Sequence, residues 1–207
     1  MSTSLAVKSY DPVFDGQKHY RTILQVTARP GTIGQLDDAA LDVPPQLNRA
    51  SALLALALFT GDISYHLDLA AADTDQFLQR ETAAKPAKAA HADFLIFPCG
   101  QHYSALREAR TGTLTFPDQG ATAIVQAEAI SPAPISSGIR LLLSGPGIET
   151  EAEVYVRGVS GELFEVLRER NAEFPVGVDT FFTCDSLATG PCVLALPRTT
   201  HVQWKQM

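Results

Sequence analysis

The apolar positions of the chain repeat with a helical period near the N-terminus and with a period of two further on. Asp11 and Pro12 suit the start of a helix, which should end before Arg29-Pro30-Gly31 because proline disfavours a helical residue before it. The apolar side chains of this segment form one stripe, made by Val13, Phe14, Tyr20, Ile23 and Leu24. A stripe of this kind is the face that a helix normally turns towards the core.

A second helix is predicted with Asn48 as its N-cap and with its end at Thr60-Gly61. It is apolar on nearly every side, so we expect it to be buried between layers. The segment 63–69 alternates with period two, which predicts a half-buried strand. Asp73 and Gln76 resemble a capping box that opens a third helix, extending to about residue 84.

The rest of the chain predicts short strands with two more helices between them. Strands are expected at residues 93–97, 121–129, 139–144, 153–157, 178–184 and 191–196. Helices are expected at 101–109 and after Ser160, where Leu163, Phe164, Val166 and Leu167 should face inward. Because helices and strands are intermingled, the sequence predicts an α/β fold with a mixed sheet covered by helices. No repeat or long linker divides the chain, so we expect residues 1–207 to form a single domain.

Composition and charge limit the classes of partner. The 207 residues are 45% hydrophobic, and the net charge is −7 with only 16 basic residues spread along the chain. No cluster of Lys and Arg could neutralise a run of phosphates, so we expect no nucleic acid partner. The longest apolar run, residues 52–59, is far shorter than the roughly 20 residues of a membrane span. Residues 1–13 lack the pattern of a secretory signal, so we expect a cytoplasmic protein with no membrane contact.

The three cysteines, Cys99, Cys184 and Cys192, form no C-x-x-C pair and have no zinc-site spacing. Cys184 and Cys192 bracket a turn and could face each other across a hairpin. Since thiols of a reducing compartment normally stay reduced, we expect free thiols, with a disulfide between these two as the alternative.

Known catalytic motifs are absent from the sequence. Gly145-Pro146-Gly147 follows a predicted strand, but no Lys-Ser/Thr follows it, so it predicts a turn between strands rather than a phosphate loop. The pair His91 and Asp93 has no further metal-ligand spacing around it. None of the five lysines is predicted at a strand end, where a Schiff-base amine could be desolvated. We therefore expect no cofactor, no metal and no self-sufficient catalytic site.

Two polar groups remain as candidates for a site. Asp179 stands just inside an apolar strand and needs a cation or several N–H donors, for which Arg198 is the candidate partner. Arg198, Thr199, Thr200 and His201 together form a donor set that could receive a phosphate or phosphonate. The same residues could instead pin the hairpin or contact a partner subunit.

Seven short segments stand in a fixed order along the chain: 17–21, 30–31, 92–94, 120–122, 143–148, 174–179 and 196–202. The most distinctive are Phe174-Pro175-Val176-Gly177-Val178-Asp179 and Leu196-Pro197-Arg198-Thr199-Thr200-His201-Val202. Each segment alone is a weak signal, but their order is specific. Together they resemble the motifs of the PhnH family over nearly the whole chain. The chain departs from the family at 60–64, where members tend to carry an Asp-x-x-Thr turn, and the tail 204–207 has no counterpart.

The resemblance implies a subunit of the carbon–phosphorus lyase system, which breaks down phosphonates when phosphate is scarce. That assembly joins alkylphosphonate to the ribose of ATP with release of adenine, and the catalysis is usually attributed to the companion PhnI subunit. The implied fold is similar to that of pyridoxal-phosphate transferases without the cofactor. The implied partners are a second copy of the chain and the PhnG, PhnI and PhnJ subunits.

Two hypotheses of function follow. The first is an accessory subunit without catalysis of its own, which agrees with the absence of a catalytic motif. The alternative is a domain or enzyme that binds a phosphorylated small molecule through Arg198, His201 and Asp179.

Overall fold

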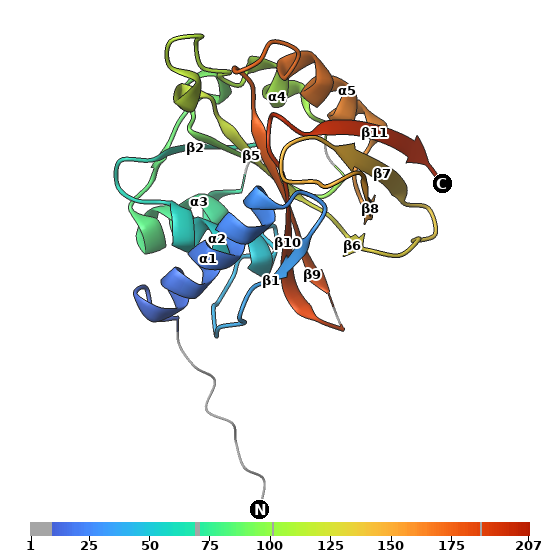
Figure 1. The fold of residues 1–207 in the computed structure, drawn as a ribbon. Helices are drawn as coiled ribbons and strands as arrows, with labels where there is room; N and C mark the ends of the chain where they lie inside the picture. Colours follow the sequence, from blue (N-terminus) through green and yellow to red (C-terminus); the bar gives the residue numbers. More distant parts are fainter. Residues whose placement is uncertain (1–9, 69–70, 101, 187) are drawn as a thin grey trace, which may run out of the picture.

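In the part of the chain that the structure describes, the strands form two sheets, and five α-helices pack around them (Figure 1). The structure is a computed structural model and describes residues 10–68, 71–100, 102–186 and 188–207. The larger sheet is mixed and has the strand order β1-β10-β9-β5-β4-β2-β3. The smaller sheet is antiparallel and has the order β11-β7-β8-β6.

The bounds of the elements are as follows. The larger sheet contains β1 (Ile33–Gln35), β2 (Ser64–Leu67), β3 (Lys85–Pro86), β4 (Phe94–Phe97), β5 (Thr122–Gln126), β9 (Asp179–Ser186) and β10 (Gly190–Leu196). The smaller sheet contains β6 (Ala129–Ser131), β7 (Ile139–Ser144), β8 (Ala152–Arg157) and β11 (His201–Gln206). The helices are α1 (Phe14–Ala28), α2 (Arg49–Leu58), α3 (Ala72–Thr82), α4 (Ser104–Glu108) and α5 (Gly161–Arg170), with 3-10 turns η1 (Ala89–His91) and η2 (Pro117–Gln119).

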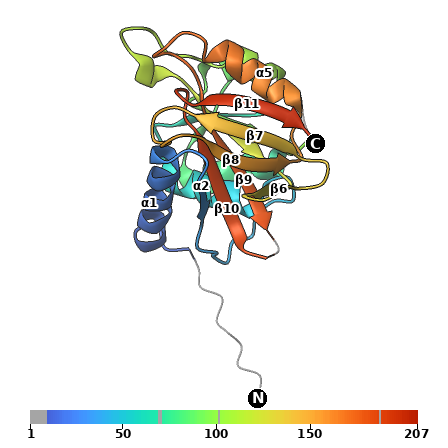
Figure 2. The ribbon, with the colours of Figure 1, turned by 45° about the vertical axis from the view of Figure 1, so that its right-hand side comes forward.

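The two faces of the larger sheet are covered by different layers. Because successive strand residues point to opposite faces, Ile96 and Phe181 pack towards α1, α2 and α3, whereas Phe97 and Phe182 pack towards α4, α5 and the smaller sheet. Figure 2 shows the smaller sheet and α5 on one side of β9 and β10, with α1 and α2 on the other. The predicted class, an α/β fold with a mixed sheet covered by helices, is confirmed. The likeness to pyridoxal-phosphate transferases stays a prediction.

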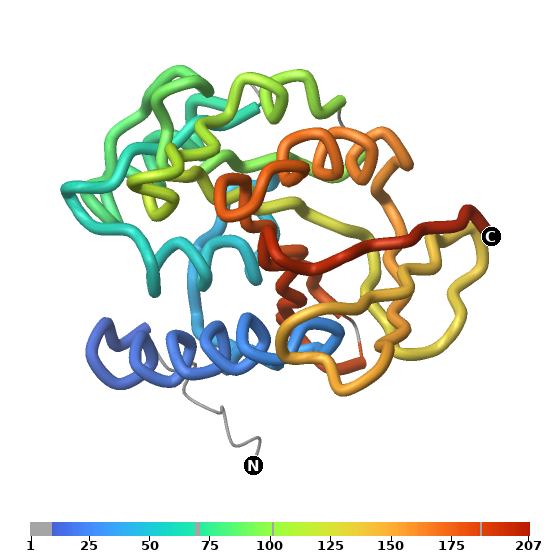
Figure 3. The backbone as a smooth tube through the Cα atoms, turned by 45° about the horizontal axis from the view of Figure 1, so that its top comes forward, coloured from blue at the N-terminus to red at the C-terminus, as the bar shows by residue number. Residues whose placement is uncertain are grey.

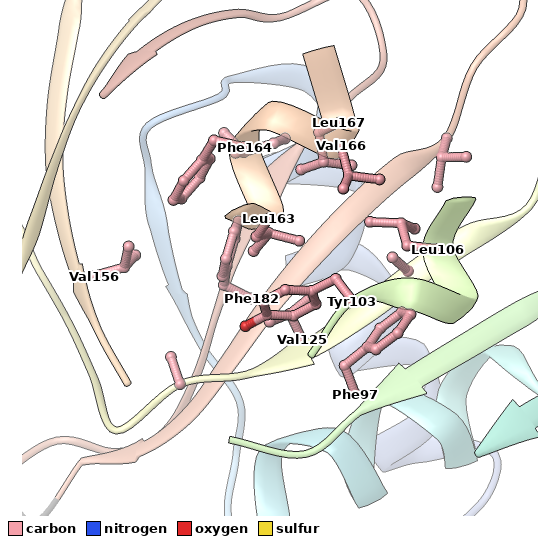
Figure 4. Close-up of a cluster of buried hydrophobic side chains, with 14 of the residues drawn as sticks. Phe97, Tyr103, Leu106, Val125, Val156, Leu163, Phe164, Val166, Leu167 and Phe182 are labelled. Carbon is pink, nitrogen blue, oxygen red and sulfur yellow. The ribbon is translucent and has the colours of Figure 1, made fainter. Parts of the chain in front are cut away.

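The core between α4, α5 and the sheets is rich in aromatic side chains (Figure 4). Phe97 and Tyr103 have ring centroids 5.5 Å apart, and Phe164 and Phe182 have centroids 6.0 Å apart. Each of these four residues is at most 1% exposed. Burying an aromatic side chain of this size contributes roughly 1.5–3 kcal/mol, so this cluster anchors α5 firmly to the sheet.

The first helix ends where predicted, but it begins at Phe14, two residues after Pro12, and it packs through another face than predicted. Val13, Phe14, Tyr20 and Leu24 of the apolar stripe are exposed, and Ile23 alone of that stripe is buried. The buried face of α1 carries Asp15, Gly16, His19, Ile23 and Val26 instead. The reason lies in close packing against β1: a Cβ atom at Gly34 would stand 2.6 Å from Thr22 and 2.7 Å from Val26. Backbone contact at this distance selects small and medium side chains rather than the largest ones.

The predictions for the next helices had mixed outcomes. The helix after Asn48 is confirmed, because the Asn48 side chain accepts a hydrogen bond from the Ser51 N–H and residues 50–55 are buried. The capping box at Asp73 is wrong. The helix begins at Ala72, so Asp73 lies in its first turn, where its charge favours the helix dipole without forming a side-chain cap.

The C-terminal part has one strand more than predicted. The β9–β10 hairpin is confirmed, but β11 follows it and pairs with β7 (Figure 1). Cys184 and Cys192 are direct partners across the hairpin, with sulfur atoms 3.6 Å apart, and both are buried free thiols.

Some expectations lie outside what the structure tests. Residues 1–9, on which the expectation about a secretory signal depends, and residue 69 of the predicted strand are outside the described residues. Within residues 10–68, 71–100, 102–186 and 188–207, no helix combines the length and apolarity needed to cross a bilayer. A single domain spanning residues 1–207 stays a prediction.

Candidate functional site

The guanidinium of Arg198 is surrounded by hydrogen-bond acceptors at the start of β9 and near η2. Its Nη2 donates to Oδ2 of Asp179 at 2.6 Å, and its Nε lies 3.2 Å from both carboxylate oxygens. Its Nη1 donates to the carbonyl oxygen of Pro117 at 2.6 Å. The Arg198 side chain is only 14% exposed. Each nitrogen of the guanidinium is therefore already bonded within the chain.

The β9–β10 hairpin brings Arg198 and Asp179 together. Leu196, the last residue of β10, pairs with Thr180, so the chain that leaves β10 passes beside the start of β9. The backbone N–H of Arg198 donates there to Oδ1 of Asp179 at 2.7 Å. The Asp179 side chain is 35% exposed, and these donors compensate for the water that it has lost. The ion pair thus pins the open end of the hairpin, which is one of the roles considered from the sequence.

Two glycines make room for the Arg198 side chain. A Cβ atom at Gly120 would lie 2.6 Å from Nη1 of Arg198 and 2.5 Å from the carbonyl oxygen of Gly177. A Cβ atom at Gly177 would lie 3.1 Å from Cβ of Arg198 and 2.5 Å from Oδ1 of Asn171. The segments 120–122, 174–179 and 196–202, far apart in the sequence, therefore meet around one arginine.

The turn Gly145-Pro146-Gly147 reaches the same region. It connects β7 to β8, so the predicted turn between strands is confirmed. A Cβ atom at Gly145 would lie 2.9 Å from the carbonyl oxygen of Thr199, and one at Gly147 would lie 2.2 Å from the carbonyl oxygen of Ala28. These glycines allow the backbone of the smaller sheet to touch the segment after β10 and the end of α1.

A cavity of about 570 Å³ lies beside Arg198, between α5 and the start of β11. Figure 1 shows α5 running next to β11. The volume is within the usual range for small-molecule sites, about 300–1,000 Å³. The lining is contributed by α5, the loop after it, the end of β10, the start of β11 and the β7–β8 turn: Pro146, Phe164, Leu167, Arg168, Asn171, Ala172, Phe174, Leu196, Pro197, Arg198, Thr199, Thr200, His201, Val202 and Gln203.

The polar groups at this cavity differ in how far they are available. The Thr200 hydroxyl is buried and forms no hydrogen bond with any described residue, whereas His201 is exposed. The Asn171 side chain is engaged with the backbone of Val178, at 2.7 and 3.1 Å. The Arg168 guanidinium lies over the Trp204 ring, 5.3 Å from its centroid. The cavity therefore has a largely apolar lining with few polar groups, among them the buried Thr200 hydroxyl, the His201 imidazole and the Arg168 guanidinium, rather than a nest of free cations.

The structure brings the five candidate residues, Asp179 and 198–201, to one place. It also shows a cavity wall formed by α5, which the sequence did not predict. Phe164 and Leu167 had been assigned to the core, and they also line the cavity. The inward stripe of α5 was the available signal, but a sequence cannot distinguish packing against a sheet from packing against a cavity. At the end of α5, Arg170 is half-buried and donates to the carbonyl oxygen of Ala109.

Other polar groups are occupied by the fold. Burial alone would raise the pKa of Asp93, but hydrogen bonds from Ser64 and the nearby Arg110 guanidinium outweigh it and hold this pKa below its usual value. Lys85 and Lys205 do lie on strands, contrary to prediction, but both are exposed and neither amine is desolvated. No group of three metal-ligating side chains is found among the residues that the structure describes.

Comparison with known proteins adds independent findings. The sequence model of the family described as bacterial phosphonate metabolism protein (PhnH) matches residues 8–203. The alpha-D-ribose 1-methylphosphonate 5-triphosphate synthase subunit PhnH of Rhizobium meliloti (strain 1021) is 30% identical over 196 residues, covering 93% of this chain and 92% of the relative. The putative C-P lyase subunit protein HtxG of Stutzerimonas stutzeri is 29% identical over 190 residues, covering 91% of this chain and 86% of the relative.

Proposed function

Because the chain belongs to the PhnH family of bacterial phosphonate metabolism proteins, as its ordered motifs indicated, we propose that it is a subunit of a carbon–phosphorus lyase system. In this proposal the subunit supports the coupling of alkylphosphonate to the ribose of ATP, with release of adenine, and performs no catalysis of its own. It assembles with PhnG, PhnI and PhnJ in the cytoplasm, forms a homodimer when alone, and uses no cofactor.

The engagement of Arg198 is the observation that carries the accessory role. Three of the five N–H groups of the Arg198 guanidinium already donate to Asp179 and to the Pro117 carbonyl, and its charge is paired with Asp179, so little of it is left to attract a phosphonate. The motif residues around it are glycines that permit close backbone contact. These contacts support a structural role for the motif residues, which build the fold and its surfaces, rather than a role in a reaction.

Copurification tests the proposal. The full chain, coexpressed with PhnG, PhnI and PhnJ, should elute with them as one complex of constant composition. The purified chain alone should not convert ATP and methylphosphonate to adenine and the ribosyl product. Turnover by the chain alone at enzyme-like rates would show that the accessory role is wrong.

The cavity beside Arg198 favours a second candidate function, the binding of a phosphorylated small molecule with Arg198, His201 and Asp179 at its edge. The volume of about 570 Å³ and the unbonded Thr200 hydroxyl support it. Calorimetry with methylphosphonate and with ATP separates the two functions. Heat of binding that is lost in Thr200→Val and His201→Ala, while assembly with the partners is unchanged, would favour the second.

A further inference from the structure

The outer face of α1 carries four large apolar residues that are exposed to solvent: Val13, Phe14, Tyr20 and Leu24. Exposed polar side chains stand between them, at Gln17, Lys18, Arg21 and Gln25. The exposed fractions of the four apolar residues are 72%, 68%, 47% and 50%. They are four of the eight large hydrophobic residues that are exposed within the described part of the chain. Isolated exposed apolar residues are ordinary, but a group of them on one helix marks an interaction surface. Figures 2 and 3 both show α1 along an outer edge of the molecule.

A groove continues this face at the C-terminal end of α1. Its volume is about 430 Å³, and it is lined by Leu24, Gln25, Ala28, Arg29 and Thr32. Leu24 belongs to both the groove and the outer face. The helix is about 22 Å long, so the face and the groove together form one elongated, partly apolar surface with a recess at one end.

The exposed charges that α1 itself carries are of one sign, although Asp37 lies beside Lys18 and Asp11 precedes the helix. Asp15 is the only acidic residue of α1 and is buried. Lys18 pairs with Asp37 at 3.1 Å, whereas Arg21 and Arg29 are exposed and form no ion pair with any described residue. In a chain with a net charge of −7, the basic residues left without an ion pair along α1 therefore give this surface an excess of positive charge. Complementary charge on a partner would have to be acidic.

A second copy of the chain that packs α1 against α1 does not satisfy this requirement. Arg21 is the middle residue of α1, which spans Phe14–Ala28. A two-fold packing centred on the helix would bring Arg21 of one copy against Arg21 of the other, with no acidic side chain of α1 to separate them. Like charges at such a position oppose association. A bilayer is also a poor occupant, because a recess at one end suits a fixed protein side chain, which lipid does not supply.

We infer that the outer face of α1 and its groove are the docking site for a different subunit, which presents an apolar surface with an acidic border and one side chain that enters the groove. This inference rests on the proposed function, in which the chain is part of an assembly. The homodimer proposed above would use another face.

Binding of purified variants to the complex of PhnG, PhnI and PhnJ tests the inference. Tyr20→Ser/Leu24→Ser should lose at least 30-fold in affinity, because truncating buried interface anchors is costly. Leu114→Ser/Phe116→Ser is the matched control, since these residues are 64% and 54% exposed on another part of the surface, and it should bind as the unchanged chain does. Arg21→Glu should lose about tenfold and Lys85→Glu less than twofold, because Lys85 is exposed on the short strand β3.

The outcomes separate this inference from the proposed function. If the unchanged chain does not bind the complex at all, the proposed function fails. If it binds and the α1 variants bind equally well, or if the control pair loses as much, the docking site is wrong while the function stands. An effect of Tyr20→Ser/Leu24→Ser on the oligomeric state of the chain alone, or on flotation with anionic lipid vesicles, would assign the face to a second copy or to a membrane and overturn the inference.

Discussion

Replacing Arg198 by alanine gives the sharpest measure of what the closing segment, residues 196–202, does in this fold. The substitution removes the ion pair with Asp179 and the hydrogen bond to the Pro117 carbonyl. Hydrogen bonds of charged groups contribute roughly 1.5–3 kcal/mol each, and breaking a buried pair costs about 3–5 kcal/mol. Asp179 is 35% exposed, so water compensates part of the loss, and we expect unfolding to become easier by about 3 kcal/mol.

Urea unfolding, followed by the fluorescence of the single tryptophan, measures this loss. Trp204 is a suitable probe because it stacks on Phe164 of α5, with centroids 5.8 Å apart. For a chain of this length, a loss of about 3 kcal/mol also lowers Tm by roughly 6–12 °C. Arg107→Ala is the matched control, since its ion pair with Glu169 is exposed and is worth about 0–1 kcal/mol.

A small effect would refute the reasoning. If Arg198→Ala and Arg107→Ala cost the same within about 0.5 kcal/mol, the guanidinium does not hold the hairpin and is free to bind a ligand. The double-mutant cycle with Asp179→Ala completes the test, because a pair that acts together gives a coupling energy of about 0.5–3 kcal/mol.

Three further outcomes are expected. Gly120→Ala should destabilise by about 1–3 kcal/mol in the same urea assay, because its methyl group would lie 2.6 Å from a guanidinium nitrogen, while Gly61→Ala, with 3.8 Å of clearance, should be nearly neutral; equal effects would contradict the close approach. Because the pKa of Asp93 is lowered in the folded chain, its contribution to stability is fully present above the unfolded pKa of about 3.9 and is lost as pH falls through the folded value. Asp93→Asn should therefore flatten the decline of stability below about pH 5. An unchanged decline would contradict the stabilising role of the carboxylate. In Ellman's assay Cys99 should react in the native chain and all three thiols after unfolding in guanidinium, and rapid reaction of three native thiols would contradict the burial of the other two.

Part of the candidate site could be predicted from local sequence patterns. Asp179 needed a partner, and Arg198 could be named from the predicted hairpin, because the two strands are adjacent and their register follows from a short turn. The role of the glycines was beyond such reasoning. Gly120 and Gly145 are close to the closing segment only because β5 and β7 belong to different sheets that meet there, and sequence spacing carries no measure of that approach.

The first helix marks the limit most clearly. The sequence by itself determined that residues 14–28 are helical, that the fold is α/β and that the family motifs stand in order, because capping, proline and periodicity act over a few residues. Which face of that helix is buried was decided by tertiary structure alone. Gly34 brings β1 so close that only side chains such as Thr22 and Val26 fit beneath the helix, so the largest apolar residues, Phe14 and Tyr20, remain outside. A helical stripe reports which side chains prefer to leave water, whereas the neighbouring backbone decides which of them have room to do so.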